Sequence, residues 1–265
     1  MRRFSCFIAG VAISVTSLHA AGGSFFASTV ADYSQGVGAN PSYLDATTAL
    51  GTPERYTGEG IFPGPVSPVN PPFGTDEIVS LGTGGTLTVG FPSPISDDAE
   101  NLFGVDLIVF SNSFFVYDGT VGGLFATGEF VVSVSSDGTA FTPLDATFSN
   151  GLFPTLGYQD IVDPFSAMPG NVPTDFTRPM NPSLTAADFA GLSFADLLDV
   201  YGESGGGIPI DIASSGLADV NYVRIEVTSG TIAIDAFAIV PEPATISSLL
   251  CIGVAGFMIR RRGRA

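Results

Sequence analysis

Asn221-Tyr222-Val223-Arg224-Ile225-Glu226-Val227 is the stretch that decides the fold, because its apolar and polar residues alternate strictly. A period of two places Val223, Ile225 and Val227 on one face of an extended chain. This pattern predicts a β-strand with one face in the core and the other toward solvent. In the next segment, residues 231–239, apolar residues predominate at odd and even positions alike. This pattern predicts a second strand that is buried on both faces.

Further strands are expected on both sides of an Asp-Gly turn. The apolar segments are residues 86–91, 105–110, 129–135 and 140–144. Asp137-Gly138 lies between the last two segments, and Asp-Gly between apolar runs is typical of a β-hairpin. Two short helices are predicted at residues 185–189 and 193–201, where Thr or Ser is followed three positions later by Asp. We therefore predict a mainly β fold, an antiparallel β-sandwich of jelly-roll type, with short helices in a long insertion.

The N-terminal segment differs from this pattern. Arg2 and Arg3 precede an apolar run, residues 4–18, and small residues follow at Ala20 and Ala21. This order is typical of a secretory signal peptide, which we place at residues 1–22.

The C-terminal segment has three parts. Pro241-Glu242-Pro243 is followed by residues 244–259, which carry no charge, and then by Arg260-Arg261-Arg262-Gly263-Arg264. The apolar run is near the lower limit for a transmembrane helix. Arginine flanks stay on the cytoplasmic side of a membrane, so the body should lie outside the inner membrane. We predict a body at residues 23–239 and a tail at residues 240–265; an ordinary membrane anchor is the alternative for the tail.

This tail resembles the PEP-CTERM sorting tail, which is also described as the ice-binding-protein-like C-terminal domain. The resemblance rests on Pro241, Glu242 and Pro243, on the apolar span, and on the cluster Arg260, Arg261 and Arg262. It implies export of an inner-membrane-anchored precursor and recognition by an exosortase-type membrane protease. Release into the extracellular matrix or attachment at the cell surface would follow.

The body carries a second resemblance. Residues 49–53, 82–91, 106–112, 132–138 and 234–239 resemble, in this order, a family of uncharacterised bacterial cell-surface proteins. The resemblance implies a galactose-binding-like sandwich. Ser111 stands where an acidic residue is expected in that family, so no site is carried over at that position.

The composition of the body excludes several kinds of active site. Three of the nine basic residues and 25 of the 26 acidic residues lie in it, which leaves a net charge of about −22. Such a surface repels nucleic acid and anionic lipid. The body also contains no His, Lys, Cys or Trp. Histidine- or cysteine-based catalysis, thiolate or histidine zinc sites and a lysine P-loop are therefore excluded.

Carboxylates remain as candidate ligands. Asp97, Asp98 and Glu100 lie within four residues of one another and could contribute to a calcium site, although a solvated acidic loop is the alternative. Asp235 lies in a segment that is apolar on both faces, where a charge needs a partner. We expect an ion pair with Arg224, with a metal ion as the second possibility.

Three functions are compatible with the sequence. The first is a non-enzymatic cell-surface or extracellular-matrix protein, the second is a carbohydrate- or calcium-binding module, and the third is a carboxylate-based polysaccharide hydrolase. The early loops contain several aromatic residues that could stack on sugar rings or simply pack on the sandwich: Tyr33, Tyr43, Tyr56, Phe62 and Phe73. The lack of tryptophan and histidine disfavours the hydrolase.

Overall fold

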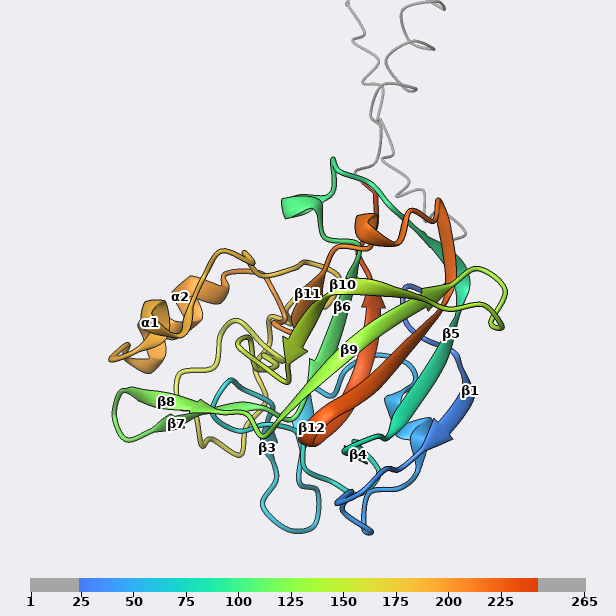
Figure 1. Cartoon of the computed structure of the whole chain (residues 1–265). Coiled ribbons are helices and arrows are strands. Elements are labelled where there is room, and N and C mark those ends of the chain that lie inside the picture. The colour runs from blue at the N-terminus through green and yellow to red at the C-terminus, as the bar shows by residue number, and fades with distance from the viewer. Residues whose placement is uncertain (1–23, 243–265) are drawn as a thin grey trace, which may run out of the picture.

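The computed structural model describes residues 24–242, which form two antiparallel sheets that share one strand (Figure 1). The first sheet consists of β1 (Thr29–Ser34), β5 (Thr86–Ser96), the first half of β12 (Asp219–Ile239), β9 (Gly128–Ser135) and β10 (Thr142–Ser149). The second consists of β4 (Val79–Gly82), the second half of β12, β6 (Leu107–Ser111) and β11 (Ile208–Ile210). The prediction of a mainly β, antiparallel, sandwich-like body is thereby confirmed.

Smaller elements complete the body. Two separate strand pairs are β2 (Tyr56–Thr57) with β3 (Gly64–Pro65), and β7 (Phe114–Tyr117) with β8 (Val121–Phe125). The α-helices are α1 (Ala186–Phe189) and α2 (Phe194–Tyr201). The 3-10 helices are η1 (Ala46–Ala49), η2 (Leu102–Gly104) and η3 (Ala213–Ser215).

Strand β12 passes from one sheet to the other, and this differs from the sequence prediction of two separate strands. Ser229-Gly230 interrupts the apolar pattern, but the backbone bends without leaving the ladder, because Gly230 still pairs with Gly128. Gly230 has a φ of 73°, and a side chain there would collide with the carbonyl of Thr127. Glycine therefore lets a single strand of 21 residues join both sheets.

The main core lies between the two sheets. Val223 and Ile225 are fully buried, as the alternation predicts, and Leu87 of β5 and Phe237 of β12 are fully buried with them. Burial of each such side chain stabilises the fold by about 1.5–3 kcal/mol. The shape of the sandwich thus follows from the apolar faces of these strands.

A second core holds the insertion beside the sandwich (Figure 1). Phe115 of β7 and Phe189 of α1 stack with their ring centroids 5.0 Å apart. Both predicted helices are present, and Thr185 and Asp188 form the capping box expected at the start of α1. The insertion consequently has its own packed interior.

The first and last described residues lie side by side. The Ile239 N–H donates to the Phe25 carbonyl at 2.7 Å, and the Val240 N–H donates to the Asp106 carbonyl at 2.9 Å. The predicted signal peptide, residues 1–22, and the predicted membrane span, residues 244–259, lie outside the described residues. Within residues 24–242, no helix has the length and apolarity needed to cross a membrane.

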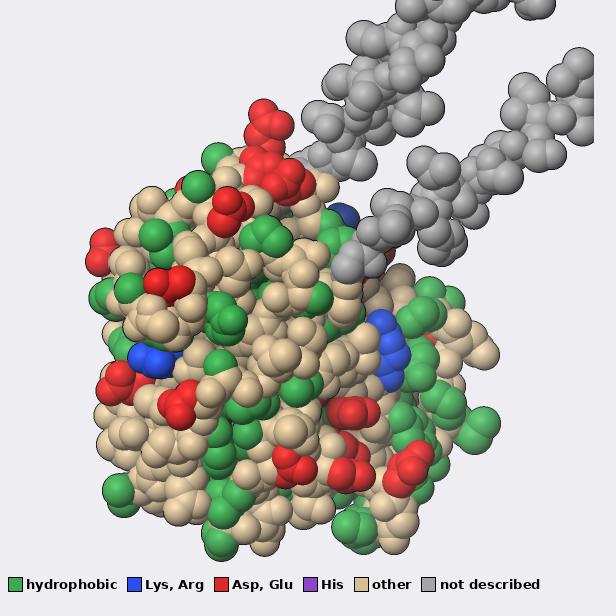
Figure 2. Space-filling view, turned by 90° about the vertical axis from the view of Figure 1, so that its right-hand side faces the viewer, with side chains coloured by type: hydrophobic (Ala, Val, Ile, Leu, Met, Phe, Trp, Pro, Cys, Tyr) green, Lys and Arg blue, Asp and Glu red, His purple; other side chains and the backbone are tan. Residues whose placement is uncertain are grey.

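The surface of the body is strongly acidic. Figure 2 shows acidic side chains at the upper end and again in the lower part of the face in view, with far fewer basic ones. The described chain contains only three basic residues, Arg55, Arg178 and Arg224, so little of this negative charge is neutralised.

Candidate functional site

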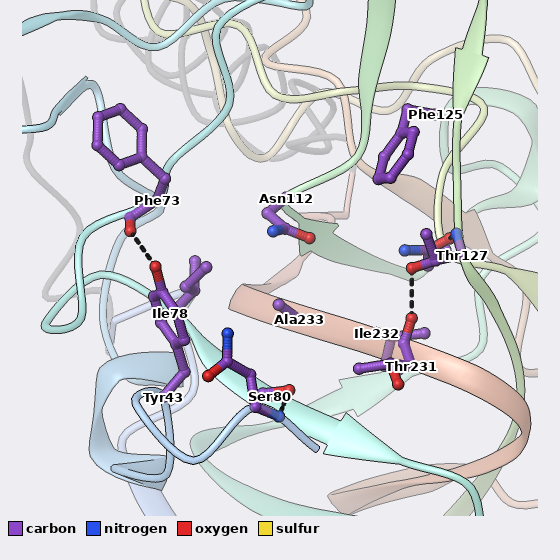
Figure 3. A pocket seen from close by; sticks show the side chains of 12 residues that line it. Tyr43, Phe73, Ile78, Ser80, Asn112, Phe125, Thr127, Thr231, Ile232 and Ala233 are labelled. Carbon is purple, nitrogen blue, oxygen red and sulfur yellow. Dashed lines mark hydrogen bonds between the residues drawn. The ribbon is translucent and has the colours of Figure 1, made fainter. Parts of the chain in front are cut away.

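A cavity with an uncharged lining opens at the bend of β12, where the two sheets meet (Figure 3). Its volume is about 220 Å³. Three carboxamides and three hydroxyl groups line it: Asn40, Asn112, Asn150, Ser80, Thr127 and Thr231. Aromatic and aliphatic side chains complete the wall: Tyr43, Phe73, Phe125, Ile78, Ile232 and Ala233. This mixture can hydrogen-bond and pack against a neutral ligand.

Asn112 occupies the centre of this pocket. Its backbone N–H donates to the Ala233 carbonyl at 3.2 Å, which fixes the turn after β6 against β12. Its carboxamide points into the cavity between Phe73 and Phe125 (Figure 3), and it forms no hydrogen bond with any residue of the described chain. A donor and an acceptor are therefore both free for a ligand.

Hydrogen bonds hold the other polar groups of the pocket in place. The Asn150 side-chain oxygen accepts the Thr127 N–H at 3.0 Å, and the Tyr43 hydroxyl donates to the Phe73 carbonyl at 2.9 Å. Phe125 is half exposed and stacks on Phe114 with the ring centroids 4.9 Å apart. The pocket is thus preformed.

A second hollow, of about 470 Å³, is acidic. Tyr43 and Phe73 line both hollows, and the acidic one also contains Glu54, Glu59, Asp76 and Glu77. Glu77 is buried, and its carboxylate accepts hydrogen bonds from four groups: the N–H groups of Phe73 at 2.9 Å, Gly74 at 2.7 Å and Gly58 at 3.1 Å, and the Thr57 hydroxyl. This carboxylate serves to join two loops.

Asp235 lies deep beside this hollow, and the predicted ion pair with Arg224 is wrong. Both carboxylate oxygens of Asp235 accept the Glu54 N–H, at 3.3 and 3.2 Å. Arg224 instead donates to the Thr88 hydroxyl at 3.0 Å and lies 3.8 Å from the centre of the Phe141 ring. The bend of β12 separates the two residues, because Arg224 belongs to the first sheet and Asp235 to the second.

The surroundings of Asp235 favour its protonated form. Burial, reinforced by the charges of Glu54 and Glu77, raises the pKa of Asp235 well above its usual value. Partial burial, followed by the charges of Glu77 and Asp76, raises the pKa of Glu54 to about 6. Both carboxyl groups therefore take up protons more readily in the folded chain than in the unfolded chain.

We expect the protein to become more stable as the pH falls from 7.5 to 4.5. Groups with raised pKa values stabilise the fold fully below their unfolded pKa, and this contribution disappears as the pH rises through the folded pKa. The slope is at most about 1.4 kcal/mol per pH unit for each proton taken up. Urea unfolding across this range should show a flatter slope for Asp235→Asn than for the wild type. The exposed control Asp199→Asn should keep the wild-type slope, and equal slopes in all three proteins would contradict the assignment.

A third cluster contains one of the predicted metal ligands. Carboxylate oxygens of Asp97, Asp106 and Asp211 all lie within 4.8 Å of one another. Asp98 and Glu100 are not part of this cluster; the Asp98 carboxylate instead accepts the Glu100 N–H at 2.8 Å. Asp235 is also separate. Of the residues predicted as metal ligands, only Asp97 belongs to this cluster, and Asp106 and Asp211 were not predicted as ligands.

The two missed partners, Asp106 and Asp211, are brought together by strand pairing. Asp106 directly precedes β6 and Asp211 directly follows β11. These antiparallel strands pair Leu107 with Ile210, so they bring the two aspartates to the same end of the sheet. The pairing could not be read from the sequence, because the strands are about a hundred residues apart.

The residues of the sorting motif begin directly after β12. Pro241 and Glu242 are exposed, whereas the preceding Val240 is buried. Pro243 and the arginine cluster Arg260, Arg261 and Arg262 lie outside the described residues. The accessible part of the motif is thus joined to the folded body without a spacer.

Comparison with known proteins supports the assignment of the tail. Residues 240–262 match the PEP-CTERM protein-sorting motif. This motif indicates an exported protein that is sorted by exosortase. No curated protein matches the chain significantly.

Proposed function

We propose that this exported protein is a non-enzymatic cell-surface or extracellular-matrix protein whose body binds an uncharged saccharide. The observation that carries the proposal is the free carboxamide of Asn112, which points into a cavity that is also lined by Phe73 and Phe125 and has no charged side chain. We further propose that the sandwich is of the jelly-roll, galactose-binding-like type. In this proposal, residues 244–259 anchor the precursor in the inner membrane until the exosortase acts.

The chemistry of the pocket suits a sugar ring. A carboxamide donates and accepts at once, and so do the hydroxyl groups of a saccharide. The Phe125 ring offers an apolar face to the C–H side of such a ring. The cavity of about 220 Å³ is smaller than the roughly 300–1,000 Å³ of pockets for drug-sized ligands. It therefore fits a single ring, such as a terminal unit or side branch of an extracellular polysaccharide.

The same lining argues for binding without catalysis. Glycoside hydrolysis requires a pair of carboxyl groups on the two sides of the scissile bond. No Asp or Glu lines the neutral pocket, and Glu77 in the neighbouring hollow is held by four hydrogen bonds. The hydrolase alternative therefore lacks support from the arrangement of the described side chains.

The test is glycan-array binding followed by calorimetry with the best neutral glycan. Asn112→Ala should weaken binding by about 5- to 100-fold, which corresponds to about 1–3 kcal/mol for hydrogen bonds lost at a desolvated site. Because Asn112 supports no other described side chain, its loss should change stability by less than about 0.5 kcal/mol. The exposed control Asn171→Ala, outside the pocket, should bind like the wild type. Absence of neutral-glycan binding at millimolar concentration, or equal binding by both variants, would refute the proposal.

A further inference from the structure

The cluster of Asp97, Asp106 and Asp211 has features of a cation site that are independent of the saccharide pocket. Asp97 follows the end of β5 and Asp211 follows β11, and both side chains are exposed. Asp106 is fully buried between them. All three contribute carboxylate oxygens within 4.8 Å of one another. Two of the three ligands thus face solvent, from which an ion can enter.

The backbone holds the buried carboxylate in a fixed position. The Ile212 N–H donates to one oxygen of Asp106 at 3.1 Å, and the Asp98 N–H donates to the other at 3.2 Å. The Asp106 N–H in turn donates to the Ile210 carbonyl at 3.0 Å. These bonds join the loops that carry Asp97 and Asp211 to Asp106, so the ligand set is assembled in advance.

Asn101 provides a second, independent observation. This residue is 4% exposed, and its side-chain nitrogen donates to Asp106 at 3.0 Å. Its side-chain oxygen is buried and accepts no hydrogen bond from the described chain. Buried polar atoms are normally satisfied. Because the amide group abuts the Asp106 carboxylate, a cation held at the cluster would give this oxygen the positive partner that it lacks.

The described basic side chains do not neutralise the cluster. Arg55 donates to the carbonyls of Gly157 and Thr174, Arg178 lies 3.7 Å from Glu203, and Arg224 packs on Phe141. These three are the arginines of the described chain, which has no lysine or histidine. Close carboxylates without a basic neighbour repel one another unless a cation or a proton intervenes.

We infer that Asp97, Asp106 and Asp211, with the side-chain oxygen of Asn101, form a calcium site. Calcium takes oxygen ligands at 2.3–2.6 Å, so two ligands on opposite sides of one ion are separated by about 4.6–5.2 Å. Carboxylate oxygens that all lie within 4.8 Å of one another can reach one such ion together. Magnesium prefers ligands at about 2.0–2.1 Å in a stricter octahedron, and the absence of nitrogen or sulfur ligands disfavours zinc. Water would complete the coordination on the exposed side.

This site also contacts the sorting junction. The carbonyl of Asp106 accepts the Val240 N–H at 2.9 Å, and Pro241 is the next residue. Calcium bound by the Asp106 side chain would therefore hold the residue from which the Pro-Glu-Pro motif departs. Calcium binding would therefore restrict the motion of the chain at Val240, directly before the Pro-Glu-Pro sequence that the protease recognises.

The experiment compares melting temperatures of the full-length chain in calcium chloride, magnesium chloride, sodium chloride of matched ionic strength, and chelator. Calcium at a hundredfold excess over Kd should raise the melting temperature of the wild type by about 5–10 °C. Asp211→Asn, an exposed change that should permit folding, should weaken calcium binding at least tenfold in calorimetry. The control Asp199→Asn removes the same charge on α2 and should respond like the wild type.

Two outcomes would overturn the inference. Matched sodium chloride could reproduce the whole shift, which would identify the cluster as a solvated acidic surface. Alternatively, Asp211→Asn and Asp199→Asn could bind calcium equally well, which would place any bound ion elsewhere. Asp97→Asn provides a second exposed variant, so a folding defect in one variant does not decide the result.

Discussion

Replacement of Pro241, Glu242 and Pro243 by alanine is expected to leave the C-terminal tail on nearly all of the exported protein. Proline lacks an N–H donor and favours an extended conformation in the residue before it, so the two prolines of the motif favour an extended protease substrate after Val240, whose N–H donates to the Asp106 carbonyl. Alanine would remove this constraint and the recognised Pro-Glu-Pro sequence together. Intact-mass measurement should show that the wild type has lost both the first 20–23 residues and the region after the motif.

Two results bear directly on this expectation. Pro182→Ala, an exposed proline before α1, should be processed like the wild type. Detection of Arg260–Arg264 on the mature wild-type protein would instead show that the tail is an ordinary membrane anchor.

Glu77→Ala is expected to lower the free energy of unfolding by about 3–5 kcal/mol. The substitution removes the acceptor of four hydrogen bonds, from the Thr57 hydroxyl and the N–H groups of Gly58, Phe73 and Gly74. Each buried donor left without a partner costs about 1–3 kcal/mol, and the adjoining hollow lets water recover part of that loss. Urea denaturation measures the change.

A matched control distinguishes this role from general charge effects. Glu59→Ala alters another carboxylate of the same hollow, one that forms no hydrogen bond within the described chain, and should change stability by less than about 0.5 kcal/mol. Glu77→Gln should fall between the two, because its amide keeps one acceptor oxygen. If Glu77→Ala and Glu59→Ala were equally stable, the carboxylate would not join the loops as described.

Local pattern was sufficient to predict both helices and the five strands β5, β6, β9, β10 and β12, but the other strands of the described chain were not predicted. The alternation at residues 221–227 and the Asp137-Gly138 turn are local signals. Each predicts secondary structure from residues that are only a few positions apart in the sequence. The join within β12 was missed for the same reason. Ser229-Gly230 looks like a turn locally, and only the partner strand β9 shows that the ladder continues through it.

The candidate sites were harder to predict, because their members come from distant segments. The burial of Asp235 followed from the apolar residues around it, but its neighbours Glu54 and Glu77 are set by loop packing. The donors to Glu77 are mostly backbone N–H groups, which carry no sequence signal. For Tyr43 and Phe73, stacking on sugars and packing on the sandwich were alternatives. In the structure the two residues are hydrogen-bonded to each other and also line the neutral pocket.

The passage of β12 through both sheets has a mechanical consequence. This strand ends at Ile239, immediately before the sorting motif, so a pull on a C-terminal attachment would enter the body along β12. The first half of β12 is hydrogen-bonded to β5 and β9, and the second half is hydrogen-bonded to β4 and β6. The hydrogen bonds lie across the direction of pull and would be loaded in shear together, which slows forced unfolding. Thr231, Ile232 and Ala233 lie on this loaded strand and line the neutral pocket, so such a force would also be transmitted to the wall of that pocket.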